Sequence, residues 1–390
     1  MGLKIVEFSD AYFPSLDGVV SVVHNYMNNL SKNNVCKLVA PAYPKKLGYV
    51  DNVNYEVFRC KSMFGMEGYR LALPGFDKKL LKFMKEEKFD IIHVHSPFGM
   101  GKYAIKIGKK LGIPVVATMH TKYYDDILRI VKLKSIAKLT LNNLMKVYKK
   151  ADSVWTVSKG AAQTLKEYGY KKDVIVVPNG TEYVYPENAK ELIENVNKKH
   201  NLKGKKNVFL FVGRLARYKN VELILNSLKV LKDKNIDFTM LIVGSGFDEK
   251  IIKEQTHDLG LDEKVVFLGQ IKNRDELQAY YLRADLFLFP SLFDTNGIVS
   301  IEAATHKLPT LLVKNTCASE NIIDGENGFL AENNVEDFSS KLEKIISNPQ
   351  KLKEVGQNAY KTLYKSWEQV AQEVLGHYKK IIEDYKNKKA

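Results

Sequence analysis

The stretch that decides the fold is Phe209-Leu-Phe-Val-Gly213-Arg214-Leu-Ala-Arg217-Tyr-Lys219-Asn220, at the start of the second half of the chain. Its apolar run predicts a buried strand that ends at Gly213, and a helical pattern follows. Ligands of open α/β sheets bind outside the carboxyl ends of such strands. Arg214 offers a planar guanidinium and Lys219 a compact ammonium, which together suit a diphosphate. A solvated basic turn is the alternative interpretation of the same residues.

Apolar strand-like runs alternate with amphipathic helical patterns on both sides of this stretch. The predicted strands are 3–8, 36–40, 91–94, 115–119, 153–157 and 174–177 in the first half, and 207–212, 238–243, 265–268, 286–289 and 310–313 in the second. The predicted helices are 20–31, 78–88, 101–111 and 135–150, then 221–232, 247–259, 274–283, 300–307 and 335–346. This βα alternation predicts mostly parallel sheets that are covered by helices on both faces.

A chain of 390 residues exceeds the length at which a single hydrophobic core stops growing, so two domains are expected. We predict an α/β fold of two Rossmann-like domains that face each other across a cleft. The expected parts are a basic N-terminal domain at 1–182, a polar linker at 183–206 that could hold a short helix, a C-terminal domain at 207–365 and a C-terminal helix at 366–390.

The composition fits a cytoplasmic protein. An apolar share of 45% is ordinary for a globular chain, and no apolar run approaches the roughly 18–20 residues that span a bilayer. The N-terminus lacks the features of a signal peptide. Cys36, Cys60 and Cys317 form no C-x-x-C pair and leave an odd number, which indicates reduced thiols.

Positive charge is concentrated in the first half of the chain. Residues 1–180 hold 29 Lys and Arg against 15 Asp and Glu, whereas 181–390 hold 31 against 30. This excess predicts an anionic partner, either a membrane surface or a nucleic acid. Within 122–150, eight basic residues accompany Ile136, Leu139, Leu144 and Val147 at helical spacing. The pattern predicts a basic amphipathic helix on an anionic bilayer, or a helix whose apolar side is simply core.

A second motif lies between Phe289 and Pro309, where a strand runs into a loop with Asp294, Asn296 and Gly297 and a helix then begins. The free amides at a helix N-terminus favour a phosphate or sugar hydroxyls. Glu302 lies about one and a half turns into this helix, so Asp294 and Glu302 could flank one extended ligand. The alternative is an N-capping aspartate and a surface glutamate.

Together the two loops resemble the donor site of the retaining glycosyltransferases of family 4, which have the GT-B fold. The G-R-x4-K pattern of that family appears as Gly213, Arg214 and Lys219, and its E-x7-E pattern as Asp294 and Glu302. Segments 10–18, 90–97, 118–121, 157–159, 177–180 and 365–368 resemble further family segments in the same order. The last of them resembles the start of the final helix of the family, which implies that the helix at 366–390 crosses back to the N-terminal domain. Two departures from the family stand out: Asp294 replaces the usual Glu, and Thr305 and Lys307 replace the Ala and Gly of an A-x-G-x-P pattern that ends at Pro309.

The resemblance implies a role for each matched residue. Arg214 and Lys219 would stabilise the leaving diphosphate, Asp294 would bind the hydroxyls of the donor sugar, and Glu302 would bind the ribose. His120 would contact the donor sugar near the reacting carbon. The remaining implied donor contacts come from the backbone at Gly18, Gly213, Asn296, Gly297 and Ile298.

We therefore expect a retaining hexosyltransferase that moves glucose from UDP-glucose to a membrane lipid such as diacylglycerol, at the inner face of the cell membrane. Synthesis of capsule, lipopolysaccharide or another surface polysaccharide is the rival within the same class. A nucleic-acid-binding protein and a catalytically dead GT-B scaffold are the alternatives of other classes, although no aromatic-plus-basic RNA motif is evident.

We expect neither a cofactor nor a metal ion, because neither loop holds a D-x-D suited to a metal–nucleotide site. His93 and His95 alternate on a strand and point to one face, a spacing that can bind a metal, but no third ligand is evident. One of these histidines is expected to line the acceptor cleft or to pack in the core. Gly244-Ser-Gly246 lacks the dinucleotide-binding fingerprint, which removes the main support for a dehydrogenase.

Overall fold

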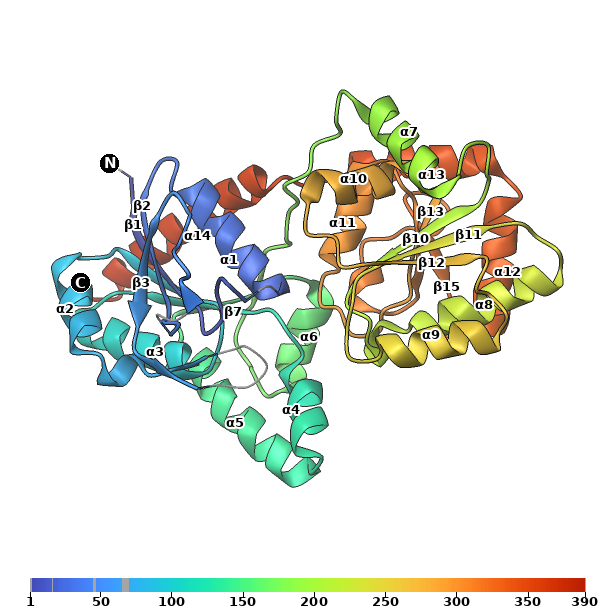
Figure 1. Ribbon diagram of the computed structural model, residues 1–390. Coiled ribbons are helices and arrows are strands. Elements are labelled where there is room, and N and C mark those ends of the chain that lie inside the picture. Colours follow the sequence, from blue (N-terminus) through green and yellow to red (C-terminus); the bar gives the residue numbers. More distant parts are fainter. Residues whose placement is uncertain (1, 16, 45–46, 65–69, 390) are drawn as a thin grey trace. The chain divides into compact units, whose positions relative to one another are not determined.

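The computed structural model describes residues 2–15, 17–44, 47–64 and 70–389, and its residues fall into two compact units (Figure 1). The first unit comprises Met1–Asn179 and Trp367–Ala390, and the second comprises Gly180–Ser366. Each unit is a parallel sheet with helices packed on it, so the predicted α/β class with two Rossmann-like domains is confirmed.

The first unit is built on a parallel sheet that has, within the described ranges, seven strands in the order β3-β2-β1-β6-β7-β8-β9. These strands are β1 (Lys4–Phe8), β2 (Val35–Pro41), β3 (Glu56–Cys60), β6 (Ile91–Val94), β7 (Val115–Met119), β8 (Ser153–Thr156) and β9 (Ile175–Val176). A short antiparallel hairpin, β4 (Ser62–Met63) and β5 (Leu71–Ala72), lies outside this sheet. Strands β6 and β7 are buried along their whole length, as expected for a sheet covered on both faces.

Helices cover both faces of this sheet (Figure 1). They are α1 (Gly18–Leu30), α2 (Lys78–Glu86), α3 (Gly99–Leu111), α4 (Tyr123–Val131), α5 (Lys134–Lys150), α6 (Lys159–Glu167) and α14 (Trp367–Asn387), with the 3-10 turn η2 (Pro74–Phe76). Helix α14 follows the second unit in the chain but packs along α1 (Figure 1). Its Tyr378 is fully buried there.

The second unit holds, among its described residues, a six-stranded parallel sheet in the order β12-β11-β10-β13-β14-β15. The strands are β10 (Val208–Val212), β11 (Thr239–Val243), β12 (Val265–Gly269), β13 (Leu286–Phe289), β14 (Thr310–Val313) and β15 (Phe329–Ala331). The helices are α7 (Ala189–His200), α8 (Val221–Asp233), α9 (Glu249–Asp258), α10 (Arg274–Arg283), α11 (Ile298–Thr305), α12 (Val335–Ile346) and α13 (Pro349–Leu363), with turns η3 (Arg217–Lys219) and η4 (Cys317–Ser319). In Figure 1, α8, α9 and α12 lie on one side of this sheet and α7, α10, α11 and α13 on the other.

The segment 183–206, expected to be a linker, is instead part of the second unit. Helix α7 occupies its middle and packs on α10, and Val196 and Leu202 belong to the hydrophobic core of that unit. Burial of these two side chains outweighs the polar composition of the segment. Helices α4 and α6 and strands β3 and β15 are further elements that the periodicity did not indicate.

Candidate active site

The loop after β10 carries Arg214 and Lys219 and is anchored by the residues between them. Leu215 and Ala216 are buried, the amide of Leu215 donates to the carbonyl of Ser245 at 2.9 Å, and Asp248 accepts from the amide of Arg217 at 2.7 Å. The loop ends at Asn220, which adopts a left-handed conformation with φ of 60° just before α8. This anchoring holds Arg214 on the exposed side of the loop and leaves Lys219 half-buried.

Two glycines in the neighbouring loop allow this packing. A Cβ on Gly244 would lie 1.9 Å from the carbonyl oxygen of Gly213, and one on Gly246 would lie 2.2 Å from that of Leu215. Any side chain there would push the Arg214 loop away. Gly244-Ser-Gly246 is not a dinucleotide fingerprint, but it positions the predicted diphosphate loop. Sequence reasoning discarded it; the signal was a pair of glycines directly after a strand of the same sheet.

Lys219 and Asp294 form an ion pair at the carboxyl edge of the sheet. The Nζ of Lys219 lies 2.7 Å from both carboxylate oxygens of Asp294, and the side chains are 14% and 22% exposed. The ammonium also lies over the ring of Phe289, 5.6 Å from its centroid. The structure thus brings together two residues that the sequence assigned to different parts of one ligand. A diphosphate bound here would share the Lys219 cation with Asp294.

The second predicted loop ends at α11, whose N-cap is Gly297 with φ of 62°. Gly297 has no side chain that could accept from the first turn, and the amide of Ser300 donates to the carbonyl of Gly297 at 2.8 Å, so the positive end of the helix dipole at Ile298 faces the loop. The buried hydroxyl oxygens of Ser291 and Ser300 have no hydrogen-bond partner in the described part of the chain. These features suit an anionic or hydroxyl-rich ligand. The two serines were missed because neither a loop serine such as Ser291 nor a helical serine such as Ser300 carries a distinctive sequence signal.

Glu302 is buried, with 5% of its surface exposed, so the interpretation as a surface glutamate is wrong. Its Oε1 accepts from Arg274 at 2.7 Å and its Oε2 accepts from the hydroxyl of Tyr281 at 2.8 Å. Arg274 in turn lies over the ring of Tyr183, 4.3 Å from the centroid, and forms an ion pair with Glu182. Asp294 and Glu302 therefore bind separate partners, and each carboxylate oxygen of Glu302 keeps a lone pair for a ligand hydroxyl.

Lys307, one of the departures from the family pattern, adopts a left-handed backbone with φ of 58°. Glycine occupies this region without strain, whereas other residues lose roughly 1 kcal/mol or more. The Nζ of Lys307 lies 4.0 Å from the ring centroid of Tyr185 and 5.7 Å from that of Tyr360. These cation–π contacts offset part of the strain.

His120 lies in the first unit, directly after β7, and is 8% exposed. Its Nε2 is 3.0 Å from Nδ1 of His95, which follows β6, and Nε2 of His95 is 3.0 Å from Oε2 of Glu7 on β1. Three adjacent strands thus place Glu7, His95 and His120 in one hydrogen-bonded row at their carboxyl ends. Sequence reasoning missed Glu7, although a single carboxylate within the apolar run 3–8 was a visible signal.

Gly18, expected to approach the phosphates, is the first residue of α1. The N-cap Asp17 accepts from the amide of Val20 at 2.8 Å. A Cβ on Gly18 would meet nothing within 4 Å, so packing within the first unit does not require glycine here. The position leaves room beside the first turn of the helix, and its role toward a donor stays a prediction.

His93 and His95 point to one face of β6, as predicted, and both are fully buried in the core. The oxygen of Glu7 and the nitrogens of His93 and His95 lie within 4.8 Å of one another. Both ring nitrogens of His93 are already hydrogen-bonded, Nε2 to Thr118 at 2.7 Å and Nδ1 to the hydroxyl of Tyr378. The three residues therefore belong to a buried hydrogen-bond network.

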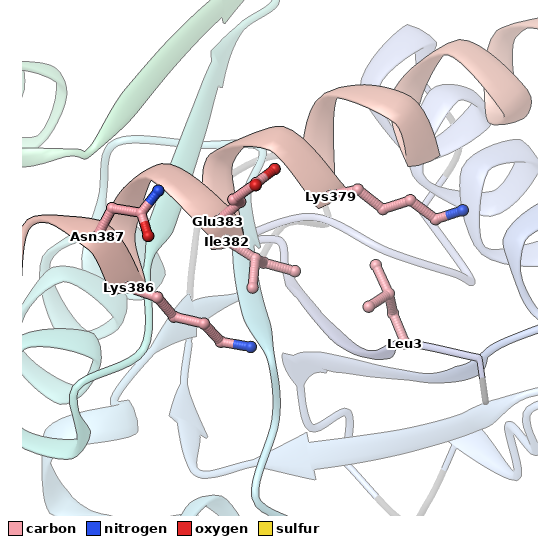
Figure 2. A pocket seen from close by; sticks show the side chains of 6 residues that line it. All are labelled: Leu3, Lys379, Ile382, Glu383, Lys386 and Asn387. Carbon is pink, nitrogen blue, oxygen red and sulfur yellow. The ribbon is translucent and has the colours of Figure 1, made fainter. Parts of the chain in front are cut away.

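Two surface hollows lie away from the predicted site residues. One lies between Leu3 and the last turns of α14 and is lined by Lys379, Ile382, Glu383, Lys386 and Asn387 (Figure 2). The other lies between α7 and α10 in the second unit. Neither contains a residue of the two motif loops. Among the helices of the described ranges, none has the length and hydropathy needed to cross a bilayer.

Comparison with known families assigns both halves of the chain. Residues 16–183 match the model described as Glycosyltransferase Family 4, and residues 193–362 match the model described as Glycosyl transferases group 1. The alpha-monoglucosyldiacylglycerol synthase of Streptococcus pneumoniae is 27% identical over 354 residues, 89% of this chain and 79% of that protein. The protein of the same name from Acholeplasma laidlawii is 26% identical over 372 residues, 92% of each chain.

A solved structure extends the comparison to the fold. The crystal structure of Anabaena HepE in complex with UDP superposes with a TM-score of 0.77 at 16% identity, covering 97% of this chain and all of that one. With both halves matched by family models and the fold shared, the chain belongs to the glycosyltransferases of family 4, which have the GT-B fold.

Proposed function

We propose that this glycosyltransferase moves glucose from UDP-glucose to a membrane lipid, with diacylglycerol as the acceptor and with retention of configuration. Support for glucose and for diacylglycerol comes from the two relatives named as monoglucosyldiacylglycerol synthases, which align over most of the chain, and support for UDP comes from the complex of Anabaena HepE with UDP. The observation that carries the choice of a lipid acceptor is an exposed apolar and basic surface on the first unit.

In the proposed reaction, Arg214 and Lys219 stabilise the charge that builds on the leaving diphosphate. The amides at Asn296, Gly297 and Ile298 bind phosphate or sugar oxygens, Glu302 accepts from the ribose hydroxyls, and Asp294 accepts from the sugar hydroxyls. His120 and Gly18 contact the donor from the first unit. The departing phosphate oxygen takes the proton of the acceptor hydroxyl, so the proposal needs neither a separate base nor a metal ion.

The surface that supports a lipid acceptor is the α4–α5 tip, which we define as Ile130, Leu133, Ile136 and Leu139 with Lys132, Lys134 and Lys138. The four apolar side chains are 70%, 56%, 44% and 72% exposed. The sequence grouped Ile136 and Leu139 with Leu144 and Val147, but the last two are buried, so only the start of α5 displays its apolar side. Apolar side chains flanked by exposed lysines suit the interface of an anionic bilayer.

The proposed reaction is tested with purified protein, a panel of UDP-, GDP- and ADP-sugars, and anionic vesicles with or without diacylglycerol. We expect turnover of UDP-glucose that depends on diacylglycerol and persists in EDTA, giving an α-linked product by NMR. Turnover that does not depend on diacylglycerol and that uses a glycan acceptor would reject the lipid acceptor. Preference for another donor, or a β-linked product, would reject the corresponding part of the proposal.

Replacing Ile130 and Leu139 with glutamate is expected to weaken binding to anionic vesicles by roughly 100-fold, because each loses about 1.5 kcal/mol of apolar burial. The measurement is vesicle co-sedimentation at fixed salt. Ile323→Glu is the matched control, since Ile323 is 56% exposed but lies in the second unit. Equal binding by the control and the double variant would show that the α4–α5 tip is not the membrane contact.

A further inference from the structure

Glu7, His95 and His120 form a continuous hydrogen-bonded row that begins in the core of the first unit. Oε2 of Glu7 lies 3.0 Å from Nε2 of His95, and Nδ1 of His95 lies 3.0 Å from Nε2 of His120. The two imidazole rings stack, with centroids 5.2 Å apart and planes 20° from parallel. His95 uses both ring nitrogens in the row and His120 uses its Nε2, so the protonation of one member constrains the next.

Aromatic side chains surround the inner end of this row. Tyr26 of α1 packs edge-on against His95 with a centroid distance of 5.8 Å, and Trp155 of β8 packs on the neighbouring His93 at 5.0 Å. Glu7 and His95 are both 0% exposed. None of the described lysine or arginine side chains forms an ion pair with Glu7. An unpaired carboxylate is costly in such a place, whereas a neutral carboxylic acid is not.

The direction of hydrogen-bond donation along the row, which we call its polarity, follows from the protonation of Glu7. A neutral Glu7 donates its O–H to Nε2 of His95, which must then carry its proton on Nδ1. That proton is donated to Nε2 of His120, so a neutral His120 carries its own proton on Nδ1. An ionised Glu7 would reverse every bond and leave Nδ1 of His120 as an acceptor.

We infer that Glu7 is a positioning residue that acts through His95 to hold His120 in the Nδ1–H tautomer, so that His120 offers a hydrogen-bond donor to the sugar nucleotide. This inference rests on the proposed function for the role of His120 at the donor. It adds a residue from the core of the first unit to the machinery. The ligand that gains from the bond is an electronegative oxygen of the donor sugar or its phosphate.

The titration behaviour of the three groups agrees with this arrangement. Burial raises the pKa of Glu7 well above its usual value, and the hydrogen bond from Tyr378 opposes this only in part. Burial lowers the pKa of His95 to about 3, and it lowers the pKa of His120 well below 6.5. Both histidines are therefore neutral near neutral pH, and the raised pKa of Glu7 favours its neutral form, which is the condition that the proposed polarity requires.

The inference is tested by NMR of ¹⁵N-histidine-labelled protein without donor, with His120 assigned by its loss in His120→Gln. We expect the Nδ1–H tautomer of His120 in the wild type. Glu7→Gln should keep it, because the glutamine amide donates to His95 as a protonated glutamate does. Glu7→Leu should give a mixture of tautomers. Thr118→Val, which removes a partner of His93 only, is the matched control and should leave His120 unchanged.

The same variants are assayed for sugar transfer. We expect Glu7→Leu to lower kcat by roughly tenfold with the donor KM nearly unchanged, and Glu7→Gln to restore it. A switch of His120 to the Nε2–H tautomer in Glu7→Gln would overturn the inference even if Glu7→Leu does not fold. So would stoichiometric zinc that is lost on mutating Glu7. Because the tautomer is measured without donor, a protein that transfers no sugar refutes the proposed function and leaves the tautomer result standing.

Discussion

Replacing Arg214 and Lys219 together with alanine is expected to lower kcat for sugar transfer by at least about 1,000-fold, because each cation stabilises charge that develops on the leaving diphosphate. The single Lys219→Ala variant should also bind UDP more weakly than a variant that combines Lys219→Ala with Asp294→Asn. Asp294 loses its partner at 2.7 Å in the single variant, and its bare carboxylate then repels the diphosphate. Single-turnover transfer and calorimetric titration with UDP measure the two effects.

The control for this prediction is Lys229→Ala. Lys229 lies on α8, the helix that follows the Arg214 loop, and pairs on the surface with Asp233. Its removal should leave both kcat and UDP binding within about twofold of wild type. UDP binding that is equally strong in the wild type and in the Arg214→Ala/Lys219→Ala double variant would remove these residues from the donor site. If the double variant raised KM and left kcat unchanged, the two cations would instead bind substrate and transition state equally well.

The sequence predicted the two motif loops because each combines a buried strand, a loop and a helix start within about fifteen residues. Gly213, Arg214 and Lys219 lie as expected after β10, and Gly297 and Ile298 lie at the start of α11. Local order of this kind is encoded locally, through apolar runs and glycine positions. The family models and the shared fold confirm the architecture that these loops implied.

The partners of these residues could not be predicted, because they come from distant parts of the chain. Arg274 binds Glu302 across 28 positions, and Glu7 meets His95 across 88. Neither pair has a spacing that the sequence makes visible, since sheet order and helix packing bring them together. The linker prediction for 183–206 failed for the same reason, because the apolar surface that covers Val196 and Leu202 lies elsewhere in the second unit.

Lowering the pH from 7.5 to 5 is expected to destabilise both units, chiefly because their buried histidines stay neutral in the folded protein. Burial lowers the pKa of His306 to about 4 and that of His95 to about 3, and it also lowers the pKa values of His93 and His120. The unfolded chain binds protons below about pH 6.5, so each such histidine costs roughly 2 kcal/mol of stability by pH 5. Thermal unfolding over this pH range measures the loss.

Carboxyl groups of the first unit act with the opposite sign. Burial raises the pKa of Asp10 to about 6 and also raises the pKa of Glu7. The folded first unit therefore keeps protons that its unfolded chain releases. The contribution of these two carboxyls to the stability of the unit is lost as the pH rises through their folded pKa values. In the first unit, the stability that the two carboxyls gain on acidification offsets part of the stability that the three histidines lose, which reduces the net loss of stability at pH 5. Among the described histidines of the second unit, His306 is the one that is buried and has a strongly lowered pKa. Asp285 of the same unit has a pKa that burial raises, so it opposes His306 as the two carboxyls oppose the histidines of the first unit.

His306→Asn isolates this contribution. Nδ1 of His306 lies 2.7 Å from the carbonyl of Glu302 four residues earlier, a bond that an asparagine amide also makes, as Asn25 does with the carbonyl of Ser21. Nε2 of His306 is buried without a partner among the described residues, so protonating it would bury an unpaired N–H as well as a charge. In the variant, the unfolding temperature of the second unit should fall less steeply between pH 7 and pH 5 than it does in the wild type. An unchanged slope in that variant would mean that His306 titrates normally in the folded protein.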